Sequence, residues 1–268
     1  MNSSDVIDCL PEERQRSILE LLTEQGRVVA SELARKFNTS EDTIRRDLRE
    51  LAAAGLCKRV YGGALPVSPA SGSLAERATQ NPERKQALAE CLIKLITPGQ
   101  VVFIDAGSTN LAIAQALPTD LKLTIITNAP AIAAVLAERE NINLVLLGGT
   151  INRTTGAALG AQTLRDVANI RPDLYILGVC ALDAELGLTA FDLEDAEFKR
   201  LVVSQAKSVI TAVTTDKLET SAPFRITGTE RLSALIVEAD ADATLLKSIC
   251  GPDVQIHIAA AIHHIPAK

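Results

Sequence analysis

A series of short apolar runs in the second half of the chain alternates with segments of helical spacing, and this alternation most limits the possible folds. The runs lie at residues 101–105, 123–127, 144–147, 174–179, 208–213 and 235–237. Apolar residues at helical spacing lie between them, at 111–117, 131–138 and 196–205. Strands that are apolar along their whole length are buried on both faces, as in parallel sheets covered by helices. The sequence therefore predicts an α/β domain with a largely parallel sheet over residues 83–268.

The composition fits a layered α/β protein with an aliphatic core. Hydrophobic residues make up 47% of the 268 positions, whereas aromatic residues make up only 3% and tryptophan is absent. The five cysteines are scattered and contain no C-x-x-C pair, so we expect no disulfide framework, no zinc site and a cytoplasmic location. No apolar run approaches the ~20 residues of a membrane-spanning helix. The acidic N-terminus is also unlike a secretory signal.

The first 64 residues have the pattern of a winged helix-turn-helix. Helical segments are expected at 11–26, 31–37 and 40–54, with Ser40 as the N-cap of the third. A β-prone run then ends in a Gly-Gly turn, as in a β-hairpin wing. Pro, Ser, Ala and Gly are frequent in residues 65–82, so we expect a linker there, between domain 1–64 and domain 83–268.

Basic residues concentrate in the N-terminal domain although the chain as a whole is acidic. The net charge is −6, yet residues 27–63 carry +3 and the remainder carries −9. This asymmetry is typical of a small DNA-binding module joined to an acidic domain that does not touch DNA.

The third expected helix separates an apolar face from a basic face. Ile44, Leu48 and Leu51 recur at helical spacing and must face the core of the module. The opposite side carries arginines, whose guanidinium groups can contact guanine edges or phosphates in the major groove. A basic surface helix without a DNA role has the same charges, and that reading is the alternative. The candidate DNA-binding residues are Ser40, Thr43, Arg45, Arg46, Arg49, Lys58, Arg59 and Tyr61.

Two motifs in this module resemble the N-terminal domain of the DeoR family of bacterial transcriptional regulators. The family pattern Ser-x-x-Thr-Ile-Arg-Arg-Asp-Leu is matched by residues 40–48, and Arg-Val-x-Gly-Gly-Ala is matched by residues 59–64. The resemblance implies double-stranded operator DNA as a partner and transcriptional repression as the function.

A run of small and hydroxyl-bearing residues follows the first expected strand of the larger domain and leads into a helix. Residues 105–110 read Asp-Ala-Gly-Ser-Thr-Asn. In such a run, backbone amides, hydroxyl groups and a helix N-terminus can bind a phosphate. An ordinary strand-to-helix turn with a Ser or Thr cap has the same composition, and it remains the alternative.

The resemblance to the DeoR family extends through this domain. The family places Asp-x-Gly-Thr-Thr, Thr-Asn and Gly-Gly after successive strands, and here these are residues 105–109 with Ser108 substituted, 127–128 and 148–149. The family's effector domain is similar to ribose-5-phosphate isomerase and glucosamine-6-phosphate deaminase, and it usually senses a sugar phosphate. The implied effector-binding residues are Asp105, Gly107, Ser108, Thr109, Thr127, Asn128, Gly148, Gly149, Lys199 and Lys217.

Lys199 and Lys217 match family lysines, and either can pair with a phosphate as a point charge. The family commonly has Asp three residues before the second lysine, whereas this chain has Thr214 there and Asp216 beside Lys217. This departure changes the expected ligand geometry. Exposure of both lysines to solvent is the alternative.

Together these patterns favour a repressor of a carbohydrate-utilisation operon that is controlled by a phosphorylated sugar, without catalytic residues, cofactor or metal. The alternative is a sugar-phosphate isomerase or deaminase with a DNA-binding appendage. Only Asp183 and Glu185 offer acid–base groups where those isomerases have paired aspartates and a Lys-Gly-Gly-Gly stretch, and Asp183 also fits a turn residue. Because a single winged module buries little DNA surface, we also expect a homo-oligomer.

Overall fold

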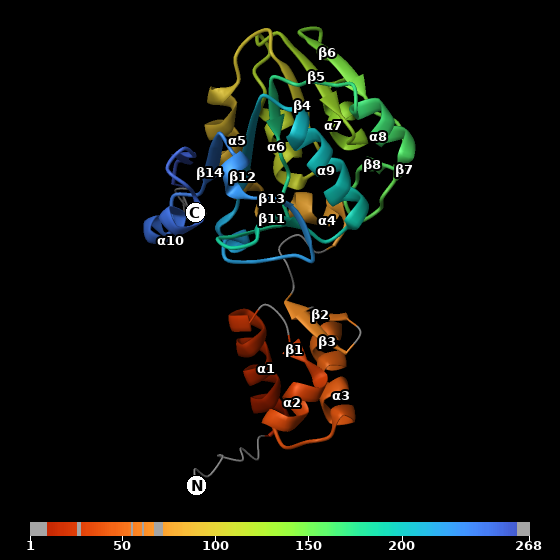
Figure 1. Cartoon of the computed structure of the whole chain (residues 1–268), viewed down its shortest axis with the longest axis vertical. Helices are drawn as coiled ribbons and strands as arrows, with labels where there is room; N and C mark the ends of the chain where they lie inside the picture. The colour runs from red at the N-terminus through yellow and green to blue at the C-terminus, as the bar shows by residue number, and fades with distance from the viewer. Residues whose placement is uncertain (1–9, 26–27, 55, 61, 67–71, 262–268) are drawn as a thin grey trace, which may run out of the picture. The chain divides into compact units, whose positions relative to one another are not determined.

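The computed structural model describes residues 10–25, 28–54, 56–60, 62–66 and 72–261. Contacts divide the chain into two compact units, residues 1–68 and 69–268, which are considered separately (Figure 1). In the part of the chain that the structure describes, no helix is both long enough and apolar enough to cross a bilayer.

The described residues of the N-terminal unit form three helices and a small antiparallel sheet. Its elements are α1 (Pro11–Gln25), β1 (Val28–Val29), α2 (Ala30–Lys36), α3 (Glu41–Ala53), β2 (Cys57–Val60) and β3 (Gly63–Pro66). The strand order is β1-β3-β2, in which β2 and β3 form the wing hairpin. Gly63 allows β1 and β3 to approach, because a Cβ there would lie 1.9 Å from the Val28 carbonyl oxygen. The predicted winged helix-turn-helix is confirmed.

Helix α3 has the N-cap and the buried apolar face that its sequence predicts. The Ser40 hydroxyl accepts a hydrogen bond from the Thr43 amide at 3.1 Å, which is the expected N-cap. Ile44, Leu48 and Leu51 are buried in one cluster with residues of α1 and α2. The basic side of α3 is therefore left on the surface of the unit.

A seven-stranded parallel sheet forms the centre of the C-terminal unit, in the order β15-β14-β12-β9-β4-β5-β6. The strands are β4 (Val101–Ile104), β5 (Leu123–Thr127), β6 (Ile142–Leu146), β9 (Leu174–Ile176), β12 (Ser208–Val213), β14 (Ala234–Val237) and β15 (Gln255–Ile258). The α/β fold class with a largely parallel sheet is confirmed.

Strand order reverses between β4 and β9, and this reversal positions the candidate site. From β4 the chain proceeds outward to β5 and β6, whereas from β9 it proceeds the other way to β12, β14 and β15. Right-handed crossovers then place α6 (Ser108–Ala116) and α7 (Pro130–Leu136) on one face, and α9 (Leu193–Gln205) and α10 (Ala243–Ile249) on the other. The crevice at such a switch point, at the carboxyl ends of the strands, is the usual ligand site of open α/β sheets.

Smaller elements surround the central sheet. They are the helices α5 (Pro82–Leu92) and α8 (Ala161–Val167), the hairpin β7 (Thr150–Ile151) and β8 (Ala158–Leu159), the antiparallel strands β10 (Ala181–Asp183), β11 (Gly187–Ala190) and β13 (Phe224–Thr227), and the 3-10 turns η1 (Ile93–Leu95), η2 (Thr215–Lys217) and η3 (Thr229–Arg231). Helix α5 packs against α6 and against β12 and β14.

Helix α4 (Leu74–Thr79) lies within residues 65–82, the segment expected to be a linker. Ser73 starts the helix through a capping box, in which its hydroxyl accepts from the Glu76 amide and the Glu76 carboxylate accepts from the Ser73 amide. A capping box satisfies two helix-terminal amides at once and stabilises even a short helix. Leu74 is buried, so α4 packs onto the C-terminal unit.

Candidate functional site

The surface of α3 presents Arg45, Arg46 and Arg49, all exposed. The guanidinium of Arg45 pairs with two carboxylates of its own helix, Glu41 at 2.8 Å and Asp42 at 3.1 Å. Arg46 pairs with Glu50 at 3.0 Å. Exposed pairs of this kind contribute little stability, so a phosphate or base edge can replace the carboxylate. Among the described residues, no carboxylate pairs with Arg49.

An ion pair beneath this surface was missed by sequence reasoning. Arg14 of α1 donates to both carboxylate oxygens of Asp47, at 2.6 and 3.2 Å, and both side chains are largely buried. Asp47 lies within the Arg-Arg-Asp-Leu motif and follows Ile44 by three positions, so it belongs to the inner face of α3. An acidic residue on an apolar helix face was the available signal, because such a charge requires a buried partner.

The remaining candidates for DNA contact are less fully described. Thr43 is half-buried and Arg59 is exposed on β2. Lys58 lies in β2, but the position of its side chain is not described, and Tyr61 lies outside the described residues. Contact of these residues with DNA stays a prediction.

The carboxyl edge of the parallel sheet brings together the effector-site candidates from β4, β5 and β6. Asp105 follows β4, Asn128 follows β5, and Gly148 comes shortly after β6. Because neighbouring parallel strands end at the same edge, these positions lie along one edge of the sheet. Binding of an effector there stays a prediction.

Asp105 is completely buried and is the most highly connected candidate. Its Oδ1 accepts from the Asn110 side chain at 2.6 Å and from the Gly178 amide at 2.7 Å, while its Oδ2 accepts from the Tyr175 hydroxyl at 2.7 Å. Burial raises the pKa of Asp105 to about 7, against the opposing charge of Lys199. Asp105 thereby fixes the junction between β4 and β9 and has little accessible surface for a ligand.

Lys199 is buried rather than exposed. Its ammonium lies 2.6 Å from Asp195 Oδ2, one helical turn earlier, and 3.7 Å from Asp105 Oδ2. Burial disfavours the charged form, but the two carboxylates outweigh it and raise the pKa of Lys199. Its charge is already balanced within the protein, so Lys199 is placed to hold Asp105, and its assignment to the effector stays a prediction.

Two buried polar atoms in the candidate site have no hydrogen-bond partner among the described residues, Thr109 Oγ1 and Asn128 Oδ1. Thr109 lies in the first turn of α6 and is 5% exposed, and Asn128 is fully buried. Buried polar atoms are paired in nearly all native structures, so each unpaired one marks a place where a water or ligand is expected. Both lie at the strand-to-helix turns where the sequence predicts a ligand.

Three further candidates, Thr127, Gly148 and Gly149, make contacts that stabilise the loops after β5 and β6. The Thr127 hydroxyl accepts from the Ala129 amide at 3.0 Å. Gly148 accepts at its carbonyl from the Thr163 hydroxyl at 2.6 Å. Gly149 has φ +149°, and a Cβ there would lie 2.2 Å from Thr163 Oγ1, so a larger residue does not fit. These contacts shape the loop, and effector contact of the three residues stays a prediction.

Lys217 ends η2 and is half-buried. Its ammonium donates to the Val179 carbonyl at 3.0 Å, just beyond β9. Burial lowers the pKa of Lys217. The lysine therefore lies at the same sheet edge as Asp105, and its ammonium donates to a carbonyl rather than to a carboxylate.

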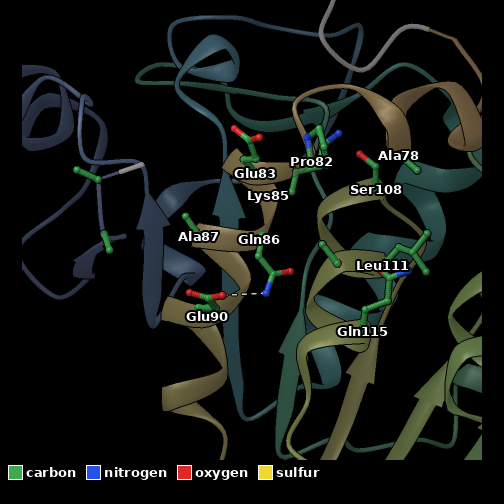
Figure 2. A pocket seen from close by; sticks show the side chains of 13 residues that line it. Ala78, Pro82, Glu83, Lys85, Gln86, Ala87, Glu90, Ser108, Leu111 and Gln115 are labelled. Carbon is green, nitrogen blue, oxygen red and sulfur yellow. Dashed lines mark hydrogen bonds between the residues drawn. The ribbon is translucent and has the colours of Figure 1, made fainter. Parts of the chain in front are cut away.

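A pocket of about 530 Å³ opens between α5 and α6, as Figure 2 shows. Ser108 and Gln115 line it from α6, while Lys85, Gln86 and Glu90 line it from α5. Ser108 therefore belongs both to the predicted phosphate-binding turn and to this pocket. Lys85 was not singled out in the sequence, since no motif links α5 to the turn after β4.

Of the two acid–base groups that the enzyme alternative offers, the Asp183 carboxylate is engaged in a turn. Asp183 Oδ1 accepts hydrogen bonds from the Glu185 amide at 2.8 Å and the Leu186 amide at 2.9 Å, between β10 and β11. Asp183 is thus a turn residue, as its alternative interpretation holds.

Comparison with known proteins matches both units to one family. Residues 80–239 match the DeoR C-terminal sensor domain, and residues 14–70 match the DeoR-like helix-turn-helix domain. The HTH-type transcriptional regulator GlpR of Haloferax volcanii is 37% identical over 237 residues, covering 87% of this chain and 92% of that protein. The glycerol-3-phosphate regulon repressor of Escherichia coli K12 is 30% identical over 247 residues, covering 92% and 98%.

Among solved structures, ribose 5-phosphate isomerase A from Methanocaldococcus jannaschii is similar in structure, with a TM-score of 0.39 and 17% sequence identity. The similar region covers 52% of this chain and 55% of the isomerase chain. The family models cover both units, and the GlpR relative spans most of the chain. The chain therefore belongs to the DeoR family of transcriptional regulators.

Proposed function

We propose that this protein is a repressor of a carbohydrate-utilisation operon that binds operator DNA through α3 and releases it when a phosphorylated sugar binds the C-terminal unit. Its relatives include proteins named as repressors of the glycerol-3-phosphate regulon and of an aga operon. Arg46 and Arg49 on the exposed face of α3 supply the charges that phosphates and guanine edges attract.

The observation that carries the effector proposal is the unpartnered, buried hydroxyl of Thr109 in the first turn of α6. Helix N-terminal amides attract anions, and Gly107 leaves room for a phosphate to approach them. Asn128 adds a second unpartnered oxygen, suited to a ligand hydroxyl. A phosphorylated polyol or sugar has both kinds of group.

Repression and release follow from a difference in affinity between two states. A ligand that prefers one arrangement of the protein shifts operator occupancy without any chemical step, by as much as its affinities for the two arrangements differ. Palindromic operators and the small contact surface of one winged module favour a homo-oligomer as the DNA-binding form.

The test is a thermal-shift screen of the full chain against glycerol 3-phosphate, hexose phosphates and the same polyols without phosphate, followed by operator-binding titrations. A ligand that binds only the folded state raises its stability. We expect a phosphorylated compound to stabilise the protein and weaken operator binding, and its unphosphorylated counterpart to do neither. Stabilisation by polyol and polyol phosphate alike would contradict the site, and operator binding unchanged by every compound would contradict the control mechanism.

A further inference from the structure

Helix α4 contacts both α6 and the β7–β8 hairpin. It packs against α6, and Ala78 of α4 lines the same pocket as the first turn of α6 (Figure 2). In the turn of the hairpin, the Thr154 carbonyl accepts a hydrogen bond from the Arg77 guanidinium of α4 at 3.0 Å. A Cβ on Gly156 in the same turn would lie 2.5 Å from Leu74 Cδ2, so Leu74 packs directly on the hairpin. Helix α4 therefore rests on two separate segments of the C-terminal unit.

The same hairpin is hydrogen-bonded to Asn128, one of the two buried residues with an unpartnered polar atom. The Ala158 amide of β8 donates to the Asn128 carbonyl at 2.7 Å, and Asn128 Nδ2 donates to the Ala158 carbonyl at 3.1 Å. The unpartnered Oδ1 belongs to the same side-chain amide. A ligand hydroxyl that donates to this oxygen therefore binds a group that already holds the hairpin.

The turn between Asn128's partner strand and α4 is stiff. Asn152 Oδ1 accepts from the amides of Thr154 and Thr155 at 3.0 and 3.1 Å, and Asn152 Nδ2 donates to Asp192 Oδ2 at 2.8 Å, at the start of α9. An Asn side chain bonded to the backbone two residues on fixes a turn in this way. A restraint placed on β8 by a ligand is therefore felt at the surface on which α4 packs.

Helix α4 itself is short and depends on these contacts. Of its six residues, all of which the structure describes, only Leu74 is buried. Its ends are held by the capping box at Ser73 and by the Lys85 ammonium, which donates to the carbonyls of Arg77 and Gln80. A helix of this length is marginal in water without packing, and elements with few buried contacts open locally at low cost in free energy.

We propose that α4 couples effector binding to operator binding, because an effector bound at Thr109 and Asn128 stabilises the docked form in which α4 packs on α6 and the hairpin. The inference rests on the proposed function and names the element that carries its control. Thr109 belongs to α6, and Asn128 is bonded to the hairpin, so a ligand that bonds to both residues joins the two surfaces beneath α4.

The position of α4 in the chain suits this role. It is the first helix after the boundary between the two units, which falls between residues 68 and 69. Coupling between two sites is reciprocal. Since the effector favours docked α4 and weakens operator binding, the operator-bound protein favours the form in which α4 is less firmly docked.

The experiment measures the operator Kd of the full chain without effector and at saturating glycerol 3-phosphate or glucose 6-phosphate. Leu74→Ala removes the apolar contact with the hairpin, and Arg77→Gln removes the hydrogen bond to Thr154. The matched controls are Leu186→Ala, on an exposed leucine, and Arg171→Gln, on an exposed arginine that also donates to backbone carbonyls.

The ratio of the two operator Kd values measures the coupling. We expect each α4 variant to lower this ratio toward one, by about 2- to 30-fold, because residues that carry coupling change it by this order. Titration calorimetry should still show effector binding by both α4 variants, which sets the saturating concentration. Leu186→Ala and Arg171→Gln should keep the ratio of the parent.

A second measurement uses the parent protein and does not depend on how the variants fold. Hydrogen exchange followed by mass spectrometry should show slower exchange of the amides of residues 75–80 at saturating effector. Unchanged exchange in α4, or the parent's ratio in both α4 variants, would overturn the role of α4 while leaving the proposed function intact. A parent whose operator affinity neither phosphorylated probe changes would overturn both.

Discussion

Arg14 of α1 and Asp47 of α3 form a two-point ion pair that joins the first helix of the DNA-binding unit to the back of its exposed arginine face. Asp47→Ala leaves the Arg14 guanidinium without this buried carboxylate, and breaking such a pair costs about 3 to 5 kcal/mol. We expect a loss of that order in the free energy of unfolding of the N-terminal unit, measured by urea denaturation. Glu50→Ala, which removes an exposed pair, should change stability far less, because solvent screens that pair. Equal stability of Asp47→Ala and Glu50→Ala would contradict a stabilising role of the buried Arg14–Asp47 pair.

Arg46→Ala and Arg49→Ala test the exposed face of α3. Both side chains point away from the buried Ile44 and Leu48, so we expect parent-like stability and weaker operator binding. Loss of a bidentate base contact costs on the order of 1 to 3 kcal/mol and relaxes specificity at one base pair. Fluorescence anisotropy at fixed salt measures the effect, with Arg16→Ala on the exposed side of α1 as the control. Parent-like operator affinity in both variants would contradict the assignment.

Lys217→Ala separates sensing from DNA binding. Lys217 belongs to the C-terminal unit, where it lies at the carboxyl edge of the sheet and contacts the Val179 carbonyl. We expect operator affinity close to that of the parent, but little release of DNA at phosphorylated-ligand concentrations that release the parent. The measurement is operator occupancy against ligand concentration. If Lys217→Ala releases all its operator DNA at the ligand concentration that releases the parent, Lys217 is not needed for sensing.

Asp105→Asn tests the buried carboxylate through the pH dependence of stability. The pKa of Asp105 rises from an ordinary value near 3.8 to about 7 on folding, so the folded state binds this proton more tightly than the unfolded state. The resulting stabilisation is complete below the unfolded pKa and is lost as the pH rises through about 7. The free energy of unfolding of the parent relative to Asp105→Asn should therefore fall between pH 4 and 7 and stay level above. A difference that rises over this range would show a lowered pKa instead.

Gly178→Ala tests the close approach of β9 to β4. A Cβ at this position would lie 2.9 Å from both the Ala106 carbonyl oxygen and Asp105 Oδ1. Overpacking of this kind costs typically ~1 to 3 kcal/mol and must displace Asp105. We expect weaker ligand binding by calorimetry and lower stability of the C-terminal unit, with operator binding retained. Gly251→Ala, where a Cβ meets nothing within 4 Å, is the matched control.

The central sheet could be predicted because its strands are apolar on both faces, which is a local property of the sequence. Strand β15 could not, since Gln255 and His257 alternate with isoleucines and the strand lies at the edge of the sheet. Helix α4 had a signal in Ser73 and Glu76, but the surrounding Pro, Ser and Gly residues obscured it.

The positions of the site residues followed from the strand ends, whereas their electrostatic surroundings did not. The burial of Lys199 depends on Asp105, which is distant in sequence, although Asp195 at four residues' distance was a visible helical partner. Lys85 could not be placed, because its contacts are with the end of another helix and its pocket forms only in the folded unit. Motifs identify strand ends, but charge balance requires the tertiary structure.

The pairing of β4 with β9 has a consequence for how the protein folds. Two partners of Asp105, Tyr175 on this neighbouring strand and Gly178 just after it, are 70 and 73 residues away in sequence, whereas β5 pairs with β4 after a single helix. Closing the longer loop costs chain entropy before any contact repays it, so such pairings are slow to form. A chain that has assembled only β4, β5 and β6 lacks the Asp105 hydrogen bonds to β9. The proposed effector site lies at this edge, so we expect it to form only after β9 has been synthesised and has paired with β4.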